Sequence, residues 1–80
     1  MTKKEKLLEK AENHPNGLSF EDFQTLMKRY GWVVDHQRGS HQIWYSPKFY
    51  RLSVQNWNGK AKGYQVKQFL TRLETENSDA

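Results

Sequence analysis

The chain has 80 residues, no cysteine and a formal net charge of +4. A single domain of this size has a small core, so we expect no cofactor and a function carried by a surface or a groove. The lack of cysteine excludes disulfides, thiolate zinc sites and cysteine nucleophiles. No apolar run approaches a membrane span, and the N-terminus lacks the apolar stretch of a signal peptide, which predicts a soluble cytoplasmic protein with no membrane partner.

Two helices are predicted in the first part of the chain. Residues 2–12 carry an apolar stripe among Lys and Glu, and a loop follows at residues 13–17. Ser19 is a suitable N-cap for the second helix, with Asp22 in an approximate capping box, and Gly31 is a good residue to end it. The apolar positions of the two helices are Leu7, Leu8, Ala11, Phe20, Phe23, Leu26, Met27 and Tyr30.

Three strands and a third helix are predicted next. Residues 32–37, 41–46 and 50–55 are rich in β-branched and aromatic residues and are separated by turns. A polar loop, 56–63, leads into an amphipathic helix at 64–75. The order α-α-β-β-β-α predicts an α+β fold, with helices packed on one face of a three-stranded antiparallel sheet.

The hydrophobic pattern also predicts a register for the first two strands. A two-residue turn at Arg38-Gly39 places His36 opposite His41, at the rim of the face that meets the helices. The other face is expected to be uncovered by helices. The covered face would carry Trp32, Val34, Ile43 and Tyr45, and the uncovered face Val33, Asp35, Gln42, Trp44, Arg51 and Ser53.

Positive charge is concentrated in residues 31–72, where Asp35 is the one acidic residue and the net charge is +6. This imbalance favours a polyanionic partner such as nucleic acid, although a solvated basic surface would have the same composition. The basic residues of the segment are Arg38, Lys48, Arg51, Lys60, Lys62, Lys67 and Arg72.

The two histidines of the predicted hairpin are the candidate chemical groups. Histidine titrates near neutral pH and can act as a general acid or base, while neighbouring cations offset phosphate charge. Arg38, Lys60 and Lys62 are the expected cations. Ordinary strand-end histidines remain the alternative, and a metal site at His36 and His41 is disfavoured because no third ligand is placed beside them.

The aromatic residues divide into two groups. Four of them, Trp32, Tyr45, Phe23 and Phe69, are expected in the core. Trp44 is predicted on the uncovered sheet face and Trp57 in a polar loop, where tryptophan can stack on bases or anchor a protein partner. Packing beneath the N-terminal helix is an equally open alternative for these two.

The sequence from "YGWVVDHQRGSHQIWYSP" to "GYQVKQFLTRLE" resembles the HicA family of toxins over residues 19–74. The resemblance implies a double-stranded-RNA-binding-domain-like fold, endoribonuclease activity on mRNA and neutralisation by a HicB-type antitoxin. The catalytic histidine of the family, in Gly-Ser-His, falls on His41. We expect RNA contacts from Arg38, Gly39, Ser40, Lys60, Lys62 and His36, and a partner interface that includes Trp44 and Arg51.

The chain is expected to form one domain over residues 1–80. Residues 1–17 would be a helical extension, 18–74 the HicA-like core and 75–80 a flexible tail. The family often has histidines where this chain has Gln42 and Trp57, and His36 is a candidate to compensate in part. A non-catalytic RNA-binding module and a protein-interaction domain are the alternative functions.

Overall fold

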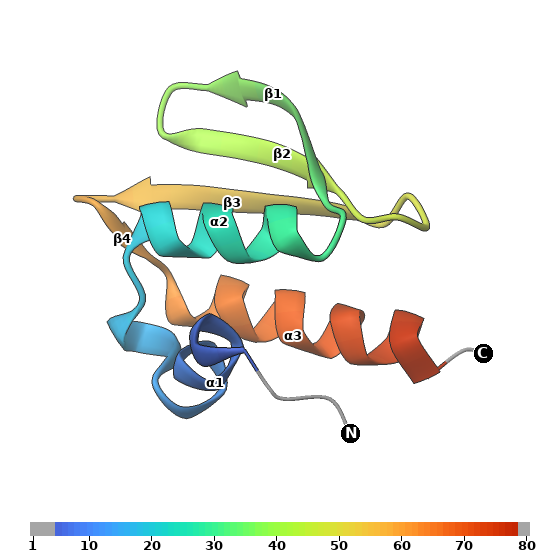
Figure 1. Ribbon diagram of the computed structural model, residues 1–80. Helices are drawn as coiled ribbons and strands as arrows, with labels where there is room; N and C mark the ends of the chain where they lie inside the picture. Colours follow the sequence, from blue (N-terminus) through green and yellow to red (C-terminus); the bar gives the residue numbers. More distant parts are fainter. Residues whose placement is uncertain (1–4, 79–80) are drawn as a thin grey trace.

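The computed structural model describes residues 5–78, which form helices and an antiparallel sheet (Figure 1). The sheet has four strands in the order β1-β2-β3-β4. The helical elements are α1 (Lys6–Asn13), the 3-10 turn η1 (Pro15–Gly17), α2 (Phe20–Arg29) and α3 (Gly63–Ser78), and the strands are β1 (Val33–Arg38), β2 (His41–Tyr45), β3 (Arg51–Trp57) and β4 (Lys60–Ala61). The α+β prediction is confirmed, with β4 as a short additional strand.

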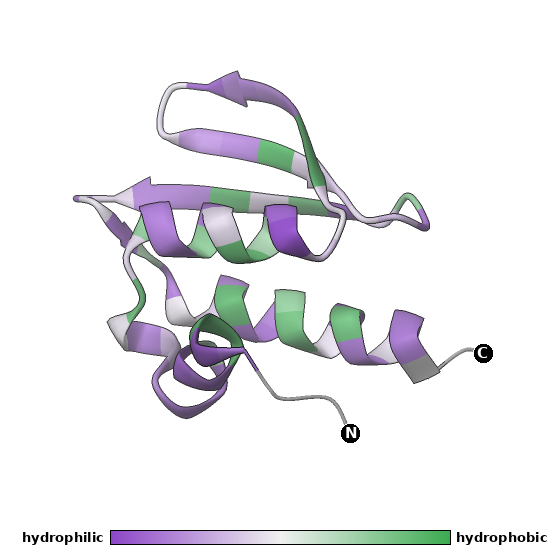
Figure 2. Ribbon diagram, viewed as in Figure 1, coloured by the Kyte–Doolittle hydropathy of each residue, from purple (hydrophilic) through white to green (hydrophobic). Residues whose placement is uncertain are grey.

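Helices α2 and α3 lie on the same side of the sheet, and α1 packs against them farther from it (Figure 1). Their apolar stripes meet in an aromatic core, where the Phe23 and Phe69 ring centroids are 5.8 Å apart and those of Trp32 and Phe69 are 5.1 Å apart. Edge-to-face contacts of this kind add to the stabilisation from burial. Hydrophobic positions on α2 and α3 alternate with hydrophilic ones, while the β1–β2 hairpin is mostly hydrophilic (Figure 2).

The predicted ends of α2 are confirmed by their hydrogen bonds and backbone angles. The Ser19 hydroxyl accepts a hydrogen bond from the Asp22 backbone N–H at 3.0 Å, as an N-cap does. Gly31 follows the helix with a φ of 85°, the left-handed conformation that glycine adopts most readily. These two residues therefore fix where α2 begins and where the chain turns into the sheet.

The first and last helices differ from the predicted bounds. Helix α1 begins at Lys6, and residues 2–4 of the predicted helix lie outside the described residues. Helix α3 continues to Ser78, so residues 75–78 of the predicted tail are helical, whereas residues 79–80 lie outside the description. The last turn is retained because the Glu76 carboxylate accepts hydrogen bonds from Ser46 and Arg72.

The predicted turn of the β1–β2 hairpin is misplaced by one residue, which shifts the pairing between the strands by two. Gly39 and Ser40 form the two-residue turn, so Arg38, rather than His36, lies opposite His41. The φ of Gly39 is 60°, and a glycine in this conformation suits the first central position of a hairpin turn. His36 pairs with Ile43 in the same register, and a β-bulge at Asp35 then shifts the pairing, so that Val34 lies opposite Trp44.

The two faces of β2 are also reversed from the prediction. Gln42 and Trp44 turn toward the helices and are buried, together with Leu52 and Val54 of β3; we call this the helix face. Trp44 is wholly buried, so its prediction as an exposed partner contact is wrong. Val34, predicted in the core, is 44% exposed. The opposite, open face carries His36, Arg38, His41, Ile43, Tyr45, Arg51 and Ser53.

Strand β4 occupies part of the predicted polar loop. Asn58 and Gly59 form the turn that joins it to β3, with φ values of 53° and 84°. The Ala61 N–H donates to Leu18 O at 3.0 Å, and the Phe20 N–H donates to Gly59 O at 2.9 Å. The start of α2 is thereby joined to the sheet edge, and the whole arrangement is the double-stranded-RNA-binding-domain-like fold that was expected.

Candidate nucleic-acid interface

His41 is the first residue of β2, and its side chain is exposed on the open face. The residues opposite it are Arg38 on β1 and Gln55 on β3. The preceding turn is tied to β3, because the Asn56 N–H donates to Ser40 O at 2.8 Å and the Gln55 side-chain amide donates to the Ser40 hydroxyl at 3.4 Å. These hydrogen bonds fix the backbone beside His41 to the neighbouring strand, and the imidazole projects from this part of the sheet.

A shallow pocket of about 340 Å³ surrounds this imidazole. It is lined by His36, Arg38, His41, Ile43 and Arg51, and we call it the His41 pocket. Three of these residues were predicted to act together, and the structure brings them together although the register behind that prediction was wrong. Arg51, which was predicted as a partner contact, adds a second guanidinium group to the same pocket. Two guanidinium groups suit a phosphate ligand.

His36 is held by its neighbour in sequence. Its ring Nδ1 lies 2.7 Å from the Asp35 carboxylate. Asp35 was predicted to point to the opposite side of the sheet, but it is the extra residue of the bulge and reaches the imidazole. Because an ionised carboxylate can only accept a hydrogen bond, this contact favours a hydrogen on Nδ1 and leaves Nε2 outside it.

A second pocket of about 360 Å³ continues from His41 toward α3. His41 and Arg51 line both this pocket and the His41 pocket, and Ser53 and Tyr64 extend it. Tyr64 in turn lines a larger cleft. The candidate site is therefore a series of adjoining depressions that begins on the open face at the His41 pocket and passes by the edge of β3 to the start of α3.

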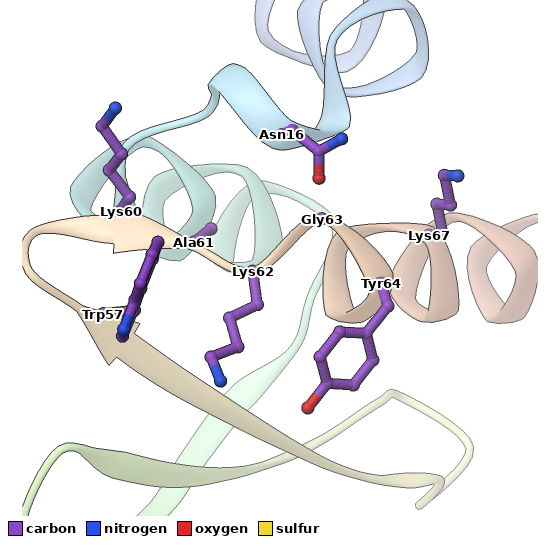
Figure 3. Close-up of a pocket in the computed structure, with 8 residues that line it drawn as sticks. All are labelled: Asn16, Trp57, Lys60, Ala61, Lys62, Gly63, Tyr64 and Lys67. Carbon is purple, nitrogen blue, oxygen red and sulfur yellow. The ribbon is translucent and has the colours of Figure 1, made fainter.

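The larger cleft, of about 660 Å³, contains the other predicted cations (Figure 3). Lys60 and Lys62 line it, so they lie at a distance along the surface from His36 and Arg38, whose pocket they do not share. We call it the Lys62 cleft; its lining is Asn16, Trp57, Lys60, Ala61, Lys62, Gly63, Tyr64 and Lys67. The expected exposure of Trp57 is confirmed, at 57%.

Two residues of the Lys62 cleft were missed from the sequence. Tyr64 and Lys67 lie in the first turns of α3, and Tyr64 is 61% exposed. The apolar stripe of α3 is formed by Val66, Phe69 and Leu73, which are buried. The sequence signal for a surface role of Tyr64 was its position outside this stripe. An aromatic residue outside that stripe is a candidate surface contact.

Gln42, next to His41, does not belong to the open face. Its side chain is 8% exposed, and its carbonyl oxygen accepts from the Trp44 indole N–H at 2.9 Å and from the Gln24 amide at 3.1 Å. Its own amide donates to Gln37 at 3.1 Å. Because side chains alternate along a strand, a residue at this position points away from the His41 pocket whatever its type. The absence of a histidine here therefore removes no imidazole from that pocket.

Within residues 5–78, no group of three or more His, Asp or Glu side chains is arranged to hold a metal ion. No helix in the same range is both long enough and apolar enough to cross a membrane.

The fold and the site together define a class: a small basic α+β domain with an exposed histidine in one pocket with two arginines on an open sheet face. Comparison with known families gives a more specific result. The model of the family described as the HicA toxin of bacterial toxin–antitoxin systems matches residues 20–74, and the chain belongs to this family. No curated protein and no solved structure matches the chain.

Proposed function

We propose that this HicA-family protein is an endoribonuclease that cleaves mRNA and uses His41 as its general acid or base. The observation that carries the proposal is the placement of His41 on the open face, in one pocket with Arg38 and Arg51. Membership of a toxin family supports it, since cleavage of mRNA would give such a protein a toxic effect. The basic surface supplies the electrostatic attraction that RNA binding needs.

The chemistry needs one base, one acid and charge neutralisation. A base removes the proton of the ribose 2′-hydroxyl, the 2′-oxygen attacks phosphorus, and the bond from phosphorus to the 5′-oxygen breaks as an acid supplies that oxygen with a proton. His41 is the proposed group for one of these transfers, and His36 is the second imidazole in the pocket. Arg38 and Arg51 would stabilise the charge on the phosphoryl oxygens.

We further propose that a HicB-type antitoxin neutralises the protein in the cytoplasm. An antitoxin that covers the open face would contact Arg51 and block access of RNA to His41. The alternative of a protein-interaction domain centred on Trp44 has lost its main support, because the Trp44 side chain is buried. A non-catalytic RNA-binding module would use the same cations, and the cleavage assay below distinguishes it from a nuclease.

The test compares RNA cleavage by purified, antitoxin-free wild type and His41→Ala. We expect about a hundredfold to ten-thousandfold loss of cleavage rate, the usual contribution of general acid–base catalysis. His14→Ala is the matched control, because His14 is also exposed but lies after α1, outside the site. Circular dichroism of each variant checks the fold.

Equal cleavage by His41→Ala and wild type would contradict the role of His41. Binding of RNA by the wild type without any cleavage would favour the non-catalytic module instead.

A further inference from the structure

We propose that the Lys62 cleft binds an unpaired RNA base between Trp57 and Tyr64, with Lys62 contacting the adjacent phosphate. The inference rests on the proposed ribonuclease function, and it adds a substrate class: single-stranded rather than duplex RNA. It also assigns substrate contacts to two aromatic residues.

The exposure of the two aromatic side chains is the first observation. Trp57 is 57% exposed at the end of β3, and Tyr64 is 61% exposed at the start of α3. Most other aromatic rings of the described chain contribute to the core or pack against it. Lys62 lies between the two rings, and the Lys62 and Tyr64 side chains extend to the same side (Figure 3). Exposed rings beside a cation are typical of surfaces that bind single-stranded nucleic acid.

The backbone segments that carry the two rings are held by hydrogen bonds. The Gly59 N–H donates to the Asn56 side chain at 2.7 Å, which holds the turn after Trp57. On the other wall, the buried Gln65 side chain accepts from the Gln55 N–H at 2.8 Å and so joins the start of α3 to β3. Because both supports are hydrogen-bonded, binding requires little ordering of the protein.

The charge of the cleft fits a phosphodiester chain. Three lysines line it, at positions 60, 62 and 67, and no acidic residue does. Lys60 and Lys67 project on the opposite side of the β4–α3 connection from Lys62 (Figure 3). Cations on both sides suit a ligand that passes through the cleft, since each can contact a different phosphate.

The cleft also adjoins the pocket that contains the candidate catalytic histidine. Tyr64 lines both the Lys62 cleft and the neighbouring pocket, which His41 also lines. A strand with one base beside Tyr64 can therefore place a nearby phosphate at His41. Bases of a duplex are stacked on one another and present no free faces, so only an unpaired nucleotide can use the two rings.

The experiment measures binding of a 2′-O-methyl RNA, which lacks the attacking hydroxyl and cannot be cleaved. Fluorescence anisotropy gives its affinity as a single strand and as a duplex with its complement. We expect Trp57→Ala and Tyr64→Ala each to weaken single-strand binding about tenfold, with duplex binding changed less than about twofold. Trp57→Phe and Tyr64→Phe keep a ring and should retain most of the affinity.

Two further variants complete the test. Phe49→Ala removes an aromatic side chain that is 83% exposed in the β2–β3 loop, and it should leave binding unchanged. Lys62→Met should reduce the slope of log affinity against log salt by about one, the effect of losing one phosphate contact. Circular dichroism confirms that each variant is folded.

Unchanged single-strand affinity in both alanine variants would overturn the proposal, as would equal losses for single strand and duplex. Loss of antitoxin binding with RNA binding intact would also overturn it and would assign the cleft to a protein partner. Failure of the proposed nuclease function would be distinguishable from failure of this proposal. If the wild type cleaves no RNA but Trp57→Ala still weakens single-strand binding, the result would contradict catalysis and support the assignment of the cleft.

Discussion

The two faces of β2 differ in almost every physical property, although their residues alternate along five positions of one strand. Gln42 and Trp44 are buried beneath the helices and joined by a hydrogen bond. His41 is exposed on the other face, in one pocket with two arginines. The comparison teaches that register decides role here: a shift of one residue would bury the candidate catalytic group and expose the core.

The largest expected effect tests the helix face. Trp44→Ala should lower the free energy of unfolding by about 3–5 kcal/mol, because it leaves a large cavity among buried side chains. Ile43 is one residue away on the open face, and its side chain is half-buried. Ile43→Ala should therefore lower the free energy of unfolding by only about 1 kcal/mol or less. Urea denaturation followed by circular dichroism measures both, and similar losses would contradict the division between the two faces.

The next largest effect is expected at Gln42, the residue of the helix face that follows His41. Gln42→Ala should cost about 1–3 kcal/mol, because the buried Trp44 indole N–H loses its acceptor. RNA cleavage at a temperature where the variant remains folded should stay within about twofold of wild type. The exposed Gln68→Ala serves as the control and should change stability by less than about 0.5 kcal/mol. A large loss of cleavage with the fold intact would place position 42 in the catalytic site.

A pH-dependent effect is expected where the end of α3 meets the β2–β3 loop. Desolvation raises the pKa of the Glu76 carboxyl, but hydrogen bonds from Ser46 and Arg72 and the Arg72 charge outweigh it, so the pKa lies below its ordinary value. A lowered pKa in the folded state stabilises the protein above the pKa of the unfolded chain, and this stabilisation is lost as the pH falls through the folded pKa.

Glu76→Gln should therefore reduce stability by about 1–2 kcal/mol at pH 7, and the difference from wild type should shrink below about pH 4. Thermal or urea denaturation as a function of pH measures it. Glu74→Gln, an exposed neighbour, should follow the wild type throughout. A stability difference that does not depend on pH would show that the charge of Glu76 is not involved.

The smallest effect tests the start of α2, which supports the helix face. Ser19→Ala should cost about 1 kcal/mol, because the Asp22 N–H loses its capping partner. Ser53→Ala, exposed on the open face, should change stability by less than about 0.5 kcal/mol. Differential scanning calorimetry can resolve both, and equal effects would argue against a capping role for Ser19.

The presence of the helices and the two ends of α2 were predictable because their signals are local. Ser19, Gly31 and the apolar stripe of α3 each act within a few residues, and the structure confirms them. The hairpin register was not predictable in the same way. Residues 32–45 carry apolar side chains at both odd and even positions, so either face of the strand could have been the buried one.

The candidate site was predicted in composition but not in layout. The resemblance to the HicA family indicated His41, and excess positive charge indicated a polyanion. The bulge at Asp35 and the separation of Lys62 from His36 depend on how strands pair, which leaves no local trace in the sequence. Tyr64 was missed because its contribution depends on the packing of α3 beside β3.

The bulge at Asp35 has a further consequence for the behaviour of the protein at high concentration. Strand β1 is an outer strand of the sheet, and a regular outer strand offers free N–H and C=O groups to which a strand of another molecule can pair. The extra residue interrupts that regular spacing in the middle of β1. The feature that turns a carboxylate toward His36 thus also makes the exposed edge a poor template for aggregation.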